Sequence, residues 1–410
     1  MRASPLSLWA FCAAVGLWLP AFAVPGLPLP MQPLDLIAVG GWPLLALYCR
    51  RATGLGLTAP LALAGSVVIS WLVVGGQAIV LTWTLAFALP FTALSAIALS
   101  DVAARRVFLS GFLVAATASA LLFLAQITLG AQALDFRTNI AFSLPPQYGR
   151  GFALFPEVST FATHITIATG VTLALLLHPA GRKRGALYAA LALFAVCLLF
   201  TRSTSVIVLA PLLVGVALRA TLTLQLRSLL IVIAIAGLIA VMMTFFITVF
   251  YADRLETHAA DRSAAMRLAS ILGGLSPLWT GELFGVGIGE NHEVRLRAHQ
   301  IARAMGLNFG TLPTGVNSQI IGRIFEEGWP ALLQMSIAAW ALLRANTTAR
   351  HSPATAALLT LGIGSLLTAL LVTGYRGIYT NWLWIAVAAA LASQPQSQPQ
   401  PHERALPCPA

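Results

Sequence analysis

The chain has 410 residues, of which 58% are hydrophobic and 9% are charged, and its formal net charge is +11. Soluble domains carry about a quarter charged residues, so this composition excludes an ordinary water-soluble protein. The basic residues are scattered between apolar runs and form no basic domain, so nucleic acid is not expected as a partner.

Apolar runs of about twenty residues recur along the whole chain, which is the length needed to cross a hydrocarbon core. They do not alternate apolar and polar residues as the strands of a membrane barrel do. We therefore predict an all-α, polytopic integral membrane protein with about twelve transmembrane helices, because backbone groups in lipid must be bonded internally. The predicted spans are 6–24, 34–49, 57–74, 77–99, 107–130, 152–178, 186–201, 203–219, 228–251, 316–343, 354–373 and 379–392.

The first apolar run also resembles a secretory signal, since Ala21-Phe22-Ala23 has the pattern of a cleavage site. We favour an uncleaved first helix because many spans follow it. With Arg2 inside and the spans alternating, the remaining inner connections are all basic, while the outer turns at 25–33 and 75–76 carry no basic residue. The outer connection 131–151, with Arg137 and Arg150, and the tight outer turns at Arg202 and Arg376 break this pattern.

The predicted division of the chain follows from these spans. It comprises transmembrane helices 1–9 at 1–251, a large outer loop at 252–315, transmembrane helices 10–12 at 316–392, and a disordered inner tail at 393–410. The loop is much longer than an ordinary connection. Because it contains Trp279, Leu283, Phe284 and a glycine cluster, we expect it to fold over the membrane surface.

The first candidate cluster is Arg150–Ala162. Pro156 suits the first turn of a helix, and Glu157 then lies at its positive end. One interpretation is an anion site, with Arg150 as donor and Glu157 as its orienter or a proton acceptor. The other is a helix cap beside an interfacial arginine. His164 lies two turns deeper on about the same face, and by itself indicates a buried neutral histidine.

Two further clusters lie in predicted outer segments. In Thr201-Arg202-Ser203 an arginine between hydroxyls suits an oxyanion, or the arginine snorkels to the interface. The long loop carries Arg262, Arg267 and the glycines of Gly285–Gly289. Spaced glycines allow close backbone approach to a neighbour or a ligand. The alternative is a solvated face followed by an ordinary glycine-rich turn.

The fourth cluster opens the tenth span and contains Asn317, Arg323, Glu326 and Glu327. Ionisable residues inside a span are costly and usually functional, which predicts a substrate-binding role for the first three. The alternative is an internal ion pair of Arg323 with Glu326 or Glu327. Arginine grips phosphate in a bidentate fork. The four clusters together therefore suit a phosphate-bearing lipid handled at the outer leaflet, without a metal or a cofactor.

The order of these motifs resembles the superfamily of bacterial O-antigen ligases and O-antigen or exopolysaccharide polymerases. The resemblance covers about residues 130–345 and rests on four matches. These are Arg150 to Ser159, Thr201 to Ser203, Arg267 with Gly285–Gly289, and Asn317 with Glu326–Gly328.

The resemblance implies a metal-independent membrane glycosyltransferase of the bacterial inner membrane. Its donor would be an undecaprenyl-diphosphate-linked glycan, and its partners membrane lipid, a chain-length regulator and a flippase. The implied catalytic residues are Arg150, Glu157, Arg202 and Arg267, and the substrate-binding residues are Arg262, Asn317, Arg323 and Glu326.

Val316 stands where the ligase branch has a histidine, which favours a polymerase over a ligase. A transporter or flippase and a purely structural membrane subunit are the competing classes. A transporter needs ionisable groups and broken helices near the midplane, whereas most charges here fall in outer connections.

Overall fold

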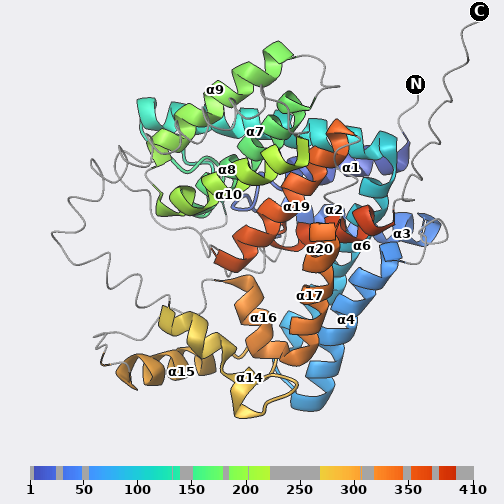
Figure 1. Cartoon of the computed structure of the whole chain (residues 1–410), viewed down its shortest axis with the longest axis vertical. Coiled ribbons are helices and arrows are strands. Elements are labelled where there is room, and N and C mark those ends of the chain that lie inside the picture. Colours follow the sequence, from blue (N-terminus) through green and yellow to red (C-terminus); the bar gives the residue numbers. More distant parts are fainter. Residues whose placement is uncertain are drawn as a thin grey trace, which may run out of the picture.

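A computed structural model describes residues 4–24, 31–48, 55–131, 133–138, 151–178, 184–201, 203–221, 268–304, 306, 318–344, 352–371 and 378–393. Their regular structure is helical throughout (Figure 1), with one isolated parallel bridge between Gly76 and Ile288. The helices are α1 (Pro5–Gly16), α2 (Pro33–Gly40), α3 (Trp42–Tyr48), α4 (Leu55–Val74), α5 (Ala78–Trp83), the π-helix η2 (Thr84–Ala88), α6 (Leu89–Ser100), α7 (Val102–Leu129), α8 (Val158–Leu177), α9 (Arg184–Thr201), α10 (Thr204–Thr221), α14 (Pro277–Thr280), α15 (Asn291–Ala304), α16 (Gln319–Glu327), α17 (Trp329–Arg344), α19 (Pro353–Leu371) and α20 (Thr380–Ala392).

The predicted all-helical class is confirmed for the described part of the chain. Four of its helical stretches are long and apolar enough to cross a membrane, namely Ala78–Ser100, Val102–Leu129, Val158–Leu177 and Pro353–Leu371. The count of about twelve spans and their direction stay predictions. The predicted ninth span, 228–251, lies outside the described residues, as does the tail beyond residue 393.

Two predicted spans are interrupted and a third is distorted, each near a residue that disfavours a continuing α-helix. The first ends at Gly16 rather than near residue 24, because Pro20 has no N–H for the helical ladder. The second divides into α2 and α3 around Gly41, where Pro43 starts the next helix. In the fourth, Leu89 N–H bonds the Thr84 carbonyl, five residues back, in the π-helix just before Pro90.

The tenth predicted span is the most strongly changed, because Gly328 separates α16 from α17 with φ +68°. Arg323 Nη1 on α16 donates to Gln334 Oε1 on α17 at 3.0 Å, across a separation of 11 residues. In one continuous helix those residues would stand about 16 Å apart along the axis. The chain therefore folds back at Gly328 into a V of two helices (Figure 1).

The helices pack as a bundle through small residues. α8 contacts α9, α10 and α19, while α20 contacts α4, α6, α17 and α19. A Cβ on Gly362 of α19 would stand 2.6 Å from Val387 Cγ1 of α20, so glycine allows these two helices to approach closely. Nearly every residue of α20 is buried, which places this helix at the centre of the bundle.

Contacts between connecting segments join regions that the sequence assigned to the same side. On the predicted inner side Ser100 Oγ bonds Ser393 Oγ at 2.9 Å. On the predicted outer side Ala21 N donates to Leu154 O at 3.0 Å, and Gly76 bridges Ile288. These pairings are consistent with the predicted alternation of the helices.

Candidate functional site

The segment 151–157, which leads into α8, is a buried turn with a strained residue. Phe152, Ala153 and Phe155 are buried, and Ala153 has φ +50°. A non-glycine residue in the left-handed region costs about 1–2 kcal/mol. Such strain persists only where the surroundings fix the backbone.

Gln126, a buried residue of α7, fixes this turn through its side-chain amide. Its Oε1 accepts from the N–H groups of Phe152 at 2.8 Å and Ala153 at 2.7 Å. Its Nε2 donates to the carbonyls of Ala153 at 3.1 Å and Leu134 at 3.0 Å. One side chain therefore provides hydrogen-bond partners for four backbone groups, which would otherwise lack these bonds.

Arg137 holds the same segment from a second direction. Its Cζ lies 3.6 Å from the centroid of the Phe152 ring, and Nη1 donates to the Pro156 carbonyl at 2.9 Å. Its Nη2 pairs with Asp135 Oδ2 at 2.9 Å. Burial alone would raise the pKa of the Asp135 carboxyl, but hydrogen bonds from Arg137 hold that pKa below its usual value. Arg137 therefore holds residues 135–137 against residues 152–156.

Glu157 stands immediately before the first residue of α8, in extended backbone. Its carboxylate accepts from the hydroxyls of Ser159 and Thr160. The structure thus places Glu157 at the positive end of the helix, with Pro156 one residue outside the first turn. Arg150, its predicted partner, lies outside the described residues.

His164 is a buried link between α8 and α20. Its Nδ1 bonds the Thr160 carbonyl at 2.8 Å, and its Nε2 bonds Thr380 Oγ1 at 2.6 Å. Because a carbonyl only accepts, Nδ1 carries the proton and Nε2 accepts from the Thr380 hydroxyl. This is the buried neutral histidine that the sequence indicated.

The second cluster forms the turn between α9 and α10. Thr201 ends α9 and donates to the Leu198 carbonyl at 2.8 Å, and Ser203 precedes α10. Arg202 lies outside the described residues. Since α9 and α10 are successive helices packed on α8, this turn is expected near the α8 end that carries Glu157.

The glycine-rich segment 283–289 docks by its backbone onto α16. Two hydrogen bonds join it to α16, Val286 N to Phe325 O at 2.9 Å and Gly287 N to Glu326 O at 3.3 Å. A third joins it to the first residue of α17, Trp329 N to Leu283 O at 3.0 Å. Two of the motifs that carry the family resemblance are therefore in direct contact.

The far side of the same segment binds the turn after α4. Gln77 N donates to the Ile288 carbonyl at 2.8 Å, and its Nε2 donates to Gly289 O at 3.0 Å. On the α16 side, a Cβ on Gly285 would overlap the Glu326 carbonyl. The spaced glycines thus bring the backbone close to a neighbouring segment of the protein, one of the two partners that the sequence allowed.

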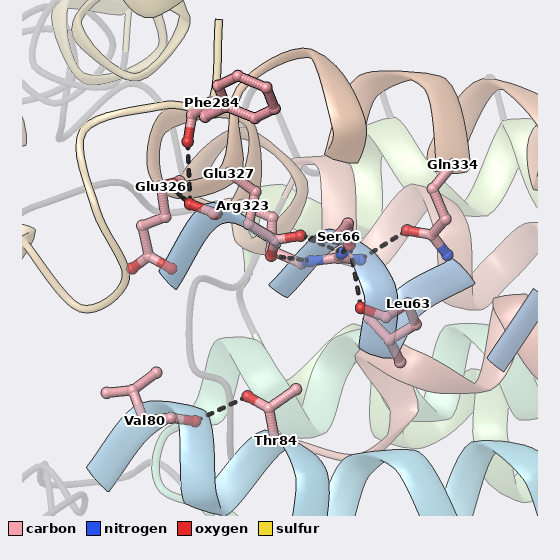
Figure 2. A network of polar contacts seen from close by, with 10 residues as sticks. Leu63, Ser66, Val80, Thr84, Phe284, Arg323, Glu326, Glu327 and Gln334 are labelled. Atoms are coloured by element: carbon pink, nitrogen blue, oxygen red, sulfur yellow. Dashed lines mark hydrogen bonds and ion pairs between the residues drawn. The ribbon is translucent and has the colours of Figure 1, made fainter. Parts of the chain in front are cut away.

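Arg323 lies in a buried network at the meeting point of α4, α16 and α17 (Figure 2). Its Nε and Nη2 each bond the Glu327 carboxylate at 2.7 Å. Nη1 reaches Gln334 and Nη2 also reaches Ser66 at 3.2 Å, while Ser66 donates to Glu327 at 2.7 Å. This arrangement is the internal ion pair that was the alternative to substrate binding, formed with Glu327.

Glu326 faces a different direction from its neighbour. Figure 2 shows its carboxylate turned away from Arg323, although the residue as a whole is buried. Its carbonyl accepts from Ser70 Oγ at 2.9 Å as well as from the glycine segment. A substrate-binding role for Glu326 stays a prediction.

The first turn of α20 connects the two halves of the candidate site. Thr380 bonds His164 of α8, and the Trp382 ring lies 5.4 Å from Arg323 Cζ. The helix that follows Glu157, α8, and the buried ion pair therefore contact nearby residues in the first turn of α20.

Arg297 of α15 fastens the folded part of the large loop. It binds Glu282 with Nη1 at 2.6 Å and Nη2 at 2.7 Å, and Glu293 with Nε at 3.1 Å. The hydrogen bonds from Arg297 lower the pKa of Glu282, so this attachment weakens only in acid, below the usual glutamate range. Arg297 also lies over Phe325 of α16, at 5.4 Å.

Five predicted site residues lie outside the described residues: Arg150, Arg202, Arg262, Arg267 and Asn317. Within the described ranges no group of three His, Cys, Asp or Glu side chains could hold a metal ion. Sequence reasoning did not single out Gln126, Ser66, Gln334 or Arg297. Gln126 and Gln334 each lie within a predicted apolar span, and this position offered a signal in advance.

Comparisons of the chain with models of known protein families and with curated proteins found no match.

Gly285→Ala is expected to detach the glycine segment from α16, whereas Gly281→Ala is not. Both glycines have positive φ, so both substitutions carry similar backbone strain of about 1–2 kcal/mol. Only at Gly285 does the new methyl meet backbone, since nothing lies within 4 Å of a Cβ at Gly281. Limited proteolysis of the purified protein should cut Gly285→Ala faster within residues 268–304. Equal cleavage of the two variants would contradict this docking.

Gln126→Leu is expected to lower stability by about 2–4 kcal/mol, because it leaves buried backbone groups of the turn without these bonds. Thr128→Val, on the same helix, is the control, since the exposed Thr128 hydroxyl bonds only carbonyls of its own helix. Thermal unfolding in detergent and amide exchange of residues 151–157 measure the effect. Similar unfolding temperatures for the two variants would show that Gln126 does not fix the turn.

Proposed function

We propose that the chain is a membrane glycosyltransferase that polymerises lipid-linked oligosaccharide units at the outer face of the bacterial inner membrane. The donor is a glycan on undecaprenyl diphosphate, and the acceptor is a sugar hydroxyl of another unit. The proposal rests on the ordered motifs of the sequence and on how their described parts lie in space.

One observation carries most weight: the backbone of 283–289 is hydrogen-bonded to the C-terminal end of α16. These segments belong to the third and fourth motifs and come from different parts of the chain. Their contact supports the idea that the motifs build one site. The link from α8 through Thr380 to the helix that packs on Arg323 brings Glu157 into the same assembly.

The proposed chemistry is electrostatic. Arg150, Arg202 and Arg267 hold the leaving diphosphate and stabilise the charge that develops on it, while Arg262 and Asn317 contact the substrate. Glu157, at the positive end of α8, orients Arg150 or accepts the proton of the attacking hydroxyl. Arg323 supports the site indirectly by holding α16 in position, because its guanidinium group is bonded to Glu327, Ser66 and Gln334.

The same proposal includes about twelve spans, with residues 252–315 as a periplasmic loop. The pairing of predicted outer segments with one another supports this arrangement, since Gly76 meets Ile288 and Ala21 meets Leu154. The lipid diphosphate would then lie at the outer interface, beside segments rich in arginine.

Alanine at Arg150, Arg202 or Arg267 is expected to reduce transfer about a hundred- to thousandfold per folded molecule, because a charge-assisted bond to the diphosphate is lost. Lysine keeps the charge without the planar fork, so it should restore only part of the rate. The assay uses purified protein and a defined lipid-linked oligosaccharide, with product length resolved and with a chelator present.

Arg106→Ala is the matched control, because Arg106 is an exposed arginine on the predicted inner side. It should transfer at the normal rate. Near-normal rates in all three outer alanine variants would remove the diphosphate role. Inhibition by the chelator, reversed by one divalent ion, would contradict the metal-free mechanism.

Deleting the gene is expected to leave single repeat units on the lipid carrier or the final acceptor, because Val316 replaces the histidine of the ligase branch. Gel analysis of the surface polysaccharide measures this. Long chains retained on undecaprenyl diphosphate, with none on lipid A, would instead identify a ligase.

A further inference from the structure

The turn at residues 276–283, which contains α14, presents large apolar side chains outward. Trp279 and Leu283 are each 59% exposed. Leu283 adjoins the start of α17, since its carbonyl accepts from Trp329 N. Along α17 the exposed large apolar side chains are Trp329, Leu333, Ile337 and Trp340, spaced as one helix face. The turn thus extends an apolar surface of a predicted span.

Hydrogen bonds and an ion pair fix the conformation of this turn, so the exposure of Trp279 and Leu283 is a stable feature of the fold. Arg297 Nη1 donates to Ser276 Oγ at 3.1 Å and also binds Glu282. Thr280 donates its hydroxyl to Glu282 at 2.9 Å, and its N–H to the Ser276 carbonyl. The polar groups of the turn are therefore bonded within the protein, while Trp279 and Leu283 face outward.

The turn also lies at the level of the last residues of α4, a predicted membrane helix. Ser70 Oγ of α4 donates to the Phe284 carbonyl at 2.9 Å. Ser70 lies four residues before the end of α4, or about 6 Å along its axis. The last residues of α4, Leu72, Val73 and Val74, are exposed and apolar. Figure 1 shows α14 beside this end of α4. A depth of about 5–10 Å is typical of interfacial segments.

The charges on α15 suit the headgroups of the same interface. Val294, Ala298 and Ala302 are buried on one face of α15, and Arg295 and Arg303 are exposed. Exposed arginines beside an apolar turn match lipid phosphates above acyl chains. Tryptophan is enriched at this level of a bilayer.

We propose that residues 276–283 insert into the outer leaflet, with Trp279 and Leu283 against phospholipid acyl chains and the exposed arginines of α15 at the phosphates. The large loop is then a membrane-docked element whose position is set by lipid as well as by protein. This inference does not depend on glycan transfer.

The test places a nitroxide label at Trp279→Cys or Leu283→Cys in the full chain, with Cys12, Cys49, Cys197 and Cys408 replaced. The protein is reconstituted in vesicles of phosphatidylethanolamine and phosphatidylglycerol. Collision with oxygen reports the bilayer, and collision with a nickel chelate reports water. Ile337→Cys on α17 is the lipid-side control, and Gln300→Cys, on the exposed face of α15 that also carries Arg303, is the headgroup-level control.

The ratio of oxygen to nickel collisions at 279 and 283 should approach that at 337 and exceed that at 300 several-fold. A ratio equal to that at 300 would overturn the proposal, because the turn would then lie no deeper than the headgroups. Exclusion of both reagents would also overturn it. Dipolar coupling between labels on different molecules would then identify a second copy of the chain as the cover.

Discussion

A charge removed from water must find its partners within the protein, and Arg323 with Glu327 meets this constraint at the centre of the fold. Each buried ion carries a desolvation penalty of several kcal/mol, so the pair is tolerated only with good geometry and further hydrogen bonds. Ser66, Gln334 and the Trp382 ring supply these contacts from α4, α17 and α20. The pair therefore fixes where α16 ends relative to three other helices.

The rest of the candidate site depends on that position. Because α16 ends at Glu327 and the chain reverses at Gly328, the carbonyls of Phe325 and Glu326 can accept hydrogen bonds from the glycine segment. The loop in turn carries the α15 helix and the exposed turn around Trp279. A substitution of Arg323 would therefore disturb the loop, because it would leave an unpaired buried charge on Glu327 that costs about 3–5 kcal/mol.

Much of this architecture could be predicted from the sequence. Apolar runs predicted the helical class, and the glycine spacing predicted a close backbone approach. The helix breaks at Pro20 and Gly328 occur at residues that disfavour a continuing helix. Average hydropathy does not register such single residues. The choice of Glu327 over Glu326 as the partner of Arg323 could not be predicted, since it depends on which face of α16 meets Ser66. The role of Gln126 likewise depends on a turn folded by tertiary contacts.

The bonds between the α4–α5 turn and the glycine segment have a consequence for how the protein is made. Gln77 and Gly289 are separated by 212 residues. At about 5–20 residues per second, a ribosome needs roughly 10–40 s to synthesise that interval. Throughout this time the C-terminal end of α4 lacks these partners, and its backbone groups must be bonded to water instead. These bonds therefore cannot form before residue 289 has been synthesised, so substitutions there should affect maturation of the chain before they affect the finished bundle.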